Sequence, residues 1–136
     1  MSAALDFFRI QQKCVMAKSK VFEVEHDHDT LIVVPQGDSL QFQEWELEES
    51  IFKLHDLFDE LQIVNLVVDL GNRRYLGSIV IGAIMALSHK PRDRGGQTIL
   101  CNASDSVREV MQVMKIDTVM PYVPTQEEAL VQIRGR

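Results

Sequence analysis

A serine beside a glycine marks the turn in this sequence that is best suited to chemistry. Ser78 lies in Tyr75-Leu-Gly-Ser-Ile-Val-Ile-Gly82, which follows the apolar run Asn65-Leu-Val-Val-Asp-Leu70. This order predicts a buried strand, a turn, and a helix that begins near Ser78. In an open α/β sheet, binding and regulation concentrate where a strand ends and a helix begins. The alternative is that Ser78 only caps the helix.

A second polar segment, His26-Asp-His-Asp29, carries side chains that can bind metals. Histidines at i and i+2 on a strand share one face, but a closed zinc site requires a full tetrahedral set of ligands. The other histidines, His55 and His89, fall in predicted helices, and Cys14 and Cys101 form no CxxC pair. We therefore interpret this segment as a solvated hairpin turn and predict no metal site.

No set of residues typical of catalysis is evident in the sequence. It lacks a Walker loop, a Ser-His-Asp spacing and paired catalytic carboxylates, and Gly71, Gly77 and Gly82 do not fit G-x-G-x-x-G. The sequence therefore predicts a protein that is not an enzyme and uses no cofactor. A small-ligand sensor or an enzyme is the lesser alternative, because it rests only on the location of the Ser78 turn.

Length and composition indicate one ordinary globular domain. The chain has 136 residues, of which 46% are hydrophobic and 25% charged, and its formal net charge is −6. The acidic balance argues against a nucleic-acid partner and against an anionic membrane surface. No apolar run approaches the about 20 residues that span a bilayer, and Asp6, Arg9 and Lys13 interrupt any secretory signal. We therefore expect a cytoplasmic protein.

The hydrophobic pattern predicts alternating strands and helices. Strands are expected over residues 21–25, 31–34, 66–68 and 98–101. The clearest helix has apolar residues at spacings of three and four that should all be buried against the sheet, namely Leu47, Ile51, Leu54, Phe58 and Leu61. The predicted fold class is α/β: a central mixed β-sheet of four or more strands with about four helices beside it.

The later helices carry recognisable signals of their own. An apolar helix is predicted over residues 79–87, where Gly82 costs about 1 kcal/mol relative to alanine; we expect close helix–sheet packing to compensate. Ser106-x-x-Glu109 has the spacing of a capping box, with Ser104 as a competing cap. Thr125-x-x-Glu128 has the same spacing and predicts the start of the last helix.

The order of these segments resembles the STAS domain family, named for sulphate transporters and anti-sigma factor antagonists. The resemblance covers about residues 21–133. It rests on the strand that ends in Asp69-Leu70, the serine turn that opens a helix, the Gly95-Gly96 turn into a strand, and the terminal Glu127-Glu-Ala-Leu130. It implies a STAS-like fold for the domain.

The resemblance also implies a function and a partner. In this family the serine at the position of Ser78 is phosphorylated by a partner kinase that is also an anti-sigma factor, and the unmodified domain binds that partner. The chain is thus expected to act in bacterial partner switching and to regulate transcription. The implied partner surface comprises this turn and the loop after the second strand: Asp38, Ser39, Gly77, Ser78, Ile79 and Gly82.

The Ser78 turn also differs from the family's usual Asp-Ser-Ser-Gly-Leu-Gly. Gly77 replaces Asp, Ile79 replaces Ser or Thr, and Val80 replaces Gly, whereas Ser78 and Gly82 match. These differences keep a second hypothesis open: a STAS scaffold or assembly module that is not phosphorylated.

The resemblance divides the chain into an N-terminal extension, residues 1–20, and a STAS-like domain, residues 21–136. The extension has no counterpart in the minimal family domain. Phe7, Phe8 and Ile10 give it apolar content, so we expect it to be ordered and to offer a homodimer interface.

Overall fold

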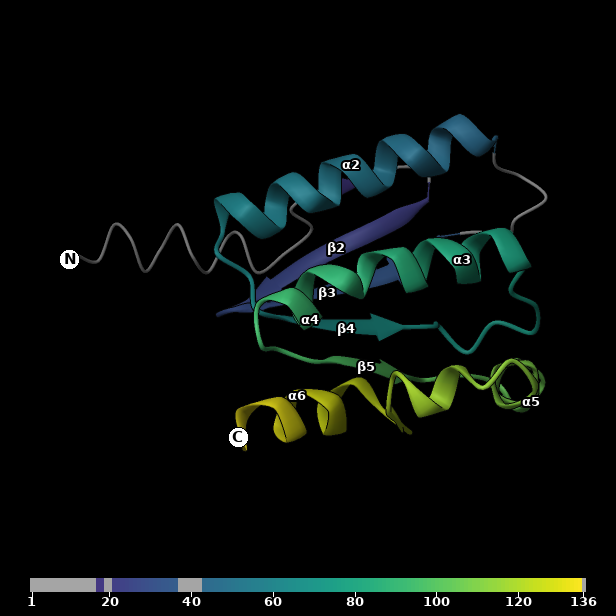
Figure 1. Cartoon of the computed structure of the whole chain (residues 1–136). Coiled ribbons are helices and arrows are strands. Elements are labelled where there is room, and N and C mark those ends of the chain that lie inside the picture. The colour runs from purple at the N-terminus through teal and green to yellow at the C-terminus, as the bar shows by residue number, and fades with distance from the viewer. Residues whose placement is uncertain (1–16, 19–20, 37–42, 136) are drawn as a thin grey trace.

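The computed structural model describes residues 17–18, 21–36 and 43–135, which form one sheet flanked by helices (Figure 1). The six strands follow one another across the sheet in chain order. They are β1 (Ala17–Lys18), β2 (Phe22–Asp27), β3 (Thr30–Pro35), β4 (Asn65–Asp69), β5 (Thr98–Cys101) and β6 (Tyr122–Val123). The first three strands pair antiparallel, and β3 to β6 pair in parallel. This mixed sheet confirms the predicted α/β fold class.

Helices cover both faces of the sheet. They are α2 (Glu44–Glu60), α3 (Ser78–Leu87), α4 (His89–Asp93), α5 (Asp105–Val113) and α6 (Gln126–Arg134), with a short 3-10 helix η2 (Ile116–Thr118). Helices α2 and α3 lie side by side on one face (Figure 1), whereas α6 packs on the opposite face. The central strands are therefore apolar without alternation: Leu66 and Val68 pack toward α2 and α3, and Val67 packs toward α6.

The predicted hairpin lies between β2 and β3, but the expectation of a solvated segment was wrong at Asp27, which belongs to β2 and is buried. Asp27 pairs with Thr30, so His28 and Asp29 form the turn. His28 has a φ of 57°, in the left-handed region that a tight turn requires.

The apolar stripe of α2 faces the core as predicted, but the prediction that all five residues are buried was wrong at its margins. Leu47, Leu54 and Phe58 are buried, whereas Ile51 and Leu61 are only partly buried. Each helical residue advances by about 100°, which places Ile51 and Leu61 at opposite edges of the stripe. Only the centre of the stripe points straight at the sheet.

Helix α3 is not buried all round, and the expected packing of Gly82 against the sheet was wrong. Gly82 is exposed, and no atom lies within 4 Å of the point where a Cβ would be. The buried residues of this helix are Val80, Ile81, Ala83, Ile84 and Leu87. Gly82 therefore lies on the face turned away from the sheet, and packing does not compensate its cost.

The capping box expected at Ser106 was wrong, whereas the competing cap Ser104 and the cap Thr125 are confirmed. Ser104, and not Ser106, caps α5, because its Oγ accepts a hydrogen bond of 3.2 Å from the N–H of Val107. Thr125 caps α6 and accepts from the N–H of Glu128 at 3.1 Å. In the described residues no helix combines the length and apolar character needed to cross a bilayer.

The predicted boundary at residue 20 stays a prediction. Ala17 pairs with Val24 and Lys18 with Glu23, so these two residues join the edge of the sheet. Residues 1–16 and 19–20, which include Phe7, Phe8 and Ile10, lie outside the described residues.

Candidate functional site

Ser78 is the first residue of α3, beside the carboxyl edge of the sheet, the edge at which the parallel strands end. Gly77 precedes it in an extended conformation and offers no side chain to cap the helix. The N–H of Ile81 makes the first intrahelical bond, of 3.0 Å, to the carbonyl of Gly77. The preceding N–H groups therefore have no helical acceptor. Ser78 itself is exposed, so its hydroxyl is accessible at an electropositive helix end.

Three of the predicted partner residues share the exposed face of α3. Ser78, Ile79 and Gly82 are all exposed, and spacings of three and four place them together on a helix. Ile79 is 50% exposed and gives this face an apolar side chain beside Ser78. Gly77 is buried behind this face and shapes the turn. Asp38 and Ser39 lie outside the described residues.

Asp69, at the end of β4, organises the segment that leads to Ser78. Its Oδ1 accepts hydrogen bonds from the N–H of Gly71 at 2.8 Å and from Nδ2 of Asn102 at 3.1 Å. Its Oδ2 accepts from Nε2 of Gln126 at 2.9 Å. One carboxylate thus ties the loop, the end of β5 and the start of α6 together. The sequence pattern did not predict this role, although it shows an aspartate at the end of a buried strand.

The neighbouring thiol of Cys101 is unsuited to nucleophilic chemistry. Burial, with a smaller effect of the Asp69 charge, raises the pKa of Cys101 to about 12. The thiol therefore stays protonated at neutral pH and packs in the core.

The loop after β3 begins beside the Ser78 segment. Nε of Arg73 donates to the carbonyl of Pro35 at 3.1 Å, and Oγ of Ser104 donates to the carbonyl of Arg73 at 2.6 Å. The end of β3, the segment after β4 and the start of α5 are therefore joined. Since β3 and β4 are parallel neighbours, their following loops emerge at the same edge of the sheet.

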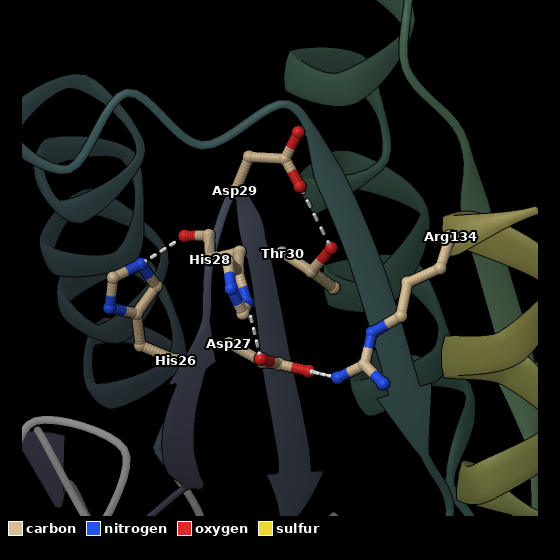
Figure 2. Close-up of polar contacts among 6 residues, drawn as sticks. All are labelled: His26, Asp27, His28, Asp29, Thr30 and Arg134. Atoms are coloured by element: carbon tan, nitrogen blue, oxygen red, sulfur yellow. Dashed lines mark hydrogen bonds and ion pairs between the residues drawn. The ribbon is translucent and has the colours of Figure 1, made fainter. Parts of the chain in front are cut away.

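A different polar cluster occupies the amino edge of the sheet, the edge at which the parallel strands begin (Figure 2). The buried carboxylate of Asp27 contacts Nδ1 of His28 at 2.8 Å and pairs with the guanidinium of Arg134 at the end of α6. Burial alone would raise the pKa of Asp27, but the hydrogen bonds from His28 and Arg134 outweigh it and hold that pKa below its usual value. The charged carboxylate therefore ties the hairpin to α6.

The histidines of this cluster point at protein atoms and not at a common centre. Nε2 of His26 contacts the carbonyl of His28, while the ring of His28 contacts Asp27 (Figure 2). Across the described part of the chain, no group of three or more His, Cys, Asp or Glu side chains is placed to hold a metal ion. A pocket of about 540 Å³ adjoins the cluster, between the hairpin and α6.

Comparison with known proteins identifies the family of this chain. The STAS domain family matches the chain over residues 21–129. The chain therefore belongs to the STAS domain family.

Solved structures share the fold at low sequence identity. The anti-sigma factor antagonist SpoIIAA in its unphosphorylated form matches with a TM-score of 0.69 and 21% identity, covering 85% of this chain and 98% of that chain. The Bacillus SpoIIAA in its phosphorylated form gives a TM-score of 0.63 and 19% identity, covering 83% and 99%. An anti-sigma-factor antagonist (STAS) domain protein from Planctomyces limnophilus gives 0.68 and 24%, covering 83% and 97%.

Proposed function

We propose that this protein is a non-enzymatic regulator that resembles an anti-sigma factor antagonist. It binds a bacterial anti-sigma factor with serine kinase activity in the cytoplasm, and phosphorylation of Ser78 releases that partner. The observation that carries the proposal is the exposed Ser78 at the uncapped N-terminus of α3. Membership of the STAS family and the likeness to SpoIIAA, which is known in unphosphorylated and phosphorylated forms, support it.

The geometry accommodates a phosphate without unfolding the domain. The N–H groups of the first turn of α3 have no helical acceptor, and the helix dipole favours an anion there. The phosphate would add about −1.5 to −2 charges. The phosphate would weaken the complex and not the folded domain, because a partner that covered this face would have to desolvate the new charge.

The unmodified face of α3 is suited to a protein contact. Ile79 offers exposed apolar surface, and Gly82 leaves room for a partner to approach the helix backbone. We place Ser78, Ile79 and Gly82 in the contact, with Gly77 supporting the turn, and Asp38 and Ser39 completing it from the loop after β3. The bond between Arg73 and Pro35 supports this arrangement, because it holds the start of that loop beside the Ser78 segment.

The scaffold hypothesis is the second candidate, and exposed Ile79 favours it. The family places Ser or Thr at that position, whereas an apolar residue suits a lasting contact that needs no switch. We propose for this alternative a homodimer through the N-terminal extension, next to β1 at the sheet edge. Deleting residues 1–16 would then halve the mass measured by light scattering, and an unchanged mass would remove the homodimer.

Isolation of the tagged chain from its native cells tests the main proposal. Mass spectrometry should find phosphate on Ser78 and, with the unphosphorylated chain only, a co-purifying protein that phosphorylates Ser78 when ATP is added. Recovery of some protein is insufficient by itself; the partner must have this kinase activity. A stable partner that binds phosphorylated and unphosphorylated chain equally would contradict the switch and favour the scaffold.

A further inference from the structure

A pocket of about 310 Å³ lies at the amino edge of the sheet, away from Ser78. Its walls include Arg92 of α4, Gln97 and Thr98 at the start of β5, and residues 119–121 after η2. Its volume falls at the lower end of the range for small-molecule sites, about 300–1,000 Å³. The described side chains that line it include no carboxylate.

Thr98 carries a buried hydroxyl that the described protein leaves without a hydrogen-bond partner. The residue is 6% exposed, and its Oγ1 is fully buried. Such groups are rare in native proteins because their desolvation is uncompensated. Ser88, in the same pocket, differs: its Oγ donates to the carbonyl of Met85 at 2.6 Å.

The direction of Thr98 follows from the alternation of β5. Ile99 and Cys101 pack in the cluster under α6, and Leu100 packs in the cluster on the opposite face. Thr98 therefore points to the same face as Leu100. That face carries Ser88 and Arg92, which line the pocket with it.

Arg92 provides an unpaired charge at the same pocket. Its side chain has no hydrogen bond or ion pair to the described residues, whereas both neighbouring cations are engaged. Lys90 pairs with Asp59 at 3.0 Å, and Arg94 donates to the carbonyls of Phe58 and Ile63 at 2.8 and 2.9 Å. Arg92 is therefore an exposed and unpaired cation among the described residues that line the pocket.

The other residues that line the pocket indicate the chemistry of a ligand that would contact Arg92 and Thr98. Val119, Met120 and Pro121 provide apolar surface, and the carboxamide of Gln97 adds a further polar group. A guanidinium and a hydroxyl match the geometry of a carboxylate or phosphate group. The apolar wall matches a short hydrocarbon body next to it.

We infer that this pocket binds a small organic anion, whose carboxylate or phosphate accepts hydrogen bonds from Arg92 and Thr98 while its apolar body packs on Met120 and Pro121. The inference is independent of the proposed function, because Ser78 lies at the other edge of the sheet. A bound anion would accept the hydrogen bond of the buried Thr98 hydroxyl, for which the described protein supplies no acceptor.

Titration of the ¹⁵N-labelled full chain with phenyl phosphate and with benzoate tests the inference by NMR. Inorganic phosphate serves as the head group alone. We expect saturable shifts of the Gly96, Gln97, Thr98 and Met120 amides, and the comparison of phenyl phosphate with benzoate identifies the preferred head group. Inorganic phosphate should bind more weakly than the preferred organic anion, because it lacks the apolar body.

Variants separate a ligand site from a purely structural role. Arg92→Gln should weaken binding at least about tenfold, as expected for a charge-assisted contact. Thr98→Val should weaken it similarly while leaving the melting temperature equal or higher, because it removes an unsatisfied hydroxyl. Thr98→Ser should retain binding. Lys53→Gln, which removes an exposed charge on α2, should leave the affinity unchanged.

Three results would overturn the inference. The first is the absence of saturable shifts with all three probes. The second is equal affinity in wild type, Arg92→Gln and Thr98→Val. The third is a lower melting temperature of Thr98→Val with unchanged affinity, which would show that the hydroxyl serves the fold through a bound water.

Discussion

The side-chain amide of Gln126 donates a 2.9 Å hydrogen bond to the carboxylate of Asp69, across 57 positions of the chain. The same carboxylate holds the N–H of Gly71 and the side chain of Asn102. Asp69 therefore connects the end of β4 to the residue directly after β5 and to the start of α6. This edge of the sheet is fixed by hydrogen bonds to one charged group, and it is the edge from which α3 and Ser78 begin.

Asp69→Ala should destabilise the fold, because it removes the acceptor of all three bonds. Hydrogen bonds to a charged group contribute about 1.5–3 kcal/mol each, and their loss is not additive. We expect the free energy of unfolding to fall by about 2–4 kcal/mol. Urea unfolding measures the change, with Asp93→Ala, an exposed aspartate at the end of α4, as the control. Equal midpoints for both variants would show that the Asp69 network contributes nothing.

Leu54→Ala should cost about 2–5 kcal/mol of unfolding free energy, because it empties a buried site in the centre of the α2 stripe. Phe52→Ala on the same helix is the control: Phe52 is 71% exposed, so its truncation should change stability by at most about 0.5 kcal/mol. Denaturant unfolding of both variants gives the comparison. A cost below that limit for Leu54 would overturn the assignment of the buried face.

Leu54 and Ile51 show how much of the fold could be predicted from the sequence. The spacing of Leu54 among its apolar neighbours predicted both the helix and its buried face, because amphipathic periodicity is a local property. The order of strands and helices with the Ser78 turn predicted the α/β fold. Ile51 shows the limit: its place at the margin of the stripe decides its burial, and the width of the covered face depends on the neighbouring helix α3.

The features that the sequence could not reveal depend on contacts between distant residues. Asp27 is buried, and Arg134, 107 positions away, is one of the two residues that compensate its charge. The unsatisfied hydroxyl of Thr98 can be recognised only when every neighbour is known. The packing expected of Gly82 was wrong for the same reason, since composition alone does not say which side of an apolar helix faces the solvent.

Gly82→Ala should raise the free energy of unfolding by about 0.5–1 kcal/mol, because alanine restricts the unfolded chain and the site has room for a Cβ. Gly95→Ala is the contrasting variant. Gly95 has a φ of +76°, so alanine there should destabilise the fold. Thermal or urea unfolding measures both. If Gly82→Ala were destabilising, the exposed position assigned to Gly82 would be contradicted.

His55 should make the protein less stable in mild acid. Burial lowers the pKa of His55 below its usual 6.5, and the nearby Lys90 and His89 lower it further, against the opposing charges of Asp59 and Asp56. The folded state therefore binds fewer protons than the unfolded state. The folded state therefore gains stability from a neutral His55. This gain is fully present above the pKa of His55 in the unfolded chain, and it is lost as the pH falls from that value through the lower pKa of the folded state.

His55→Leu provides the measurement of this effect. Urea midpoints of wild type and variant should differ by a constant amount above pH 6.5. As the pH falls below that value, wild type should lose stability relative to the variant. Parallel curves over about pH 5 to 8 would show that His55 titrates alike in the folded and unfolded states.

If the proposed function holds, Ser78→Asp should weaken binding of the proposed anti-sigma factor partner, whereas Ser78→Ala should keep it, because a carboxylate imitates part of the charge of a phosphate. We expect a loss of at least about tenfold in affinity, measured by calorimetry with the purified partner. Ser106→Asp is the matched control. Ser106 is an exposed serine in the first turn of α5, so this substitution adds the same charge to a helix N-terminus outside the proposed contact. Its affinity should equal that of wild type. If wild type, Ser78→Ala and Ser78→Asp bound equally, charge at this position would have no effect on the complex, and the scaffold hypothesis would replace the phosphorylation switch.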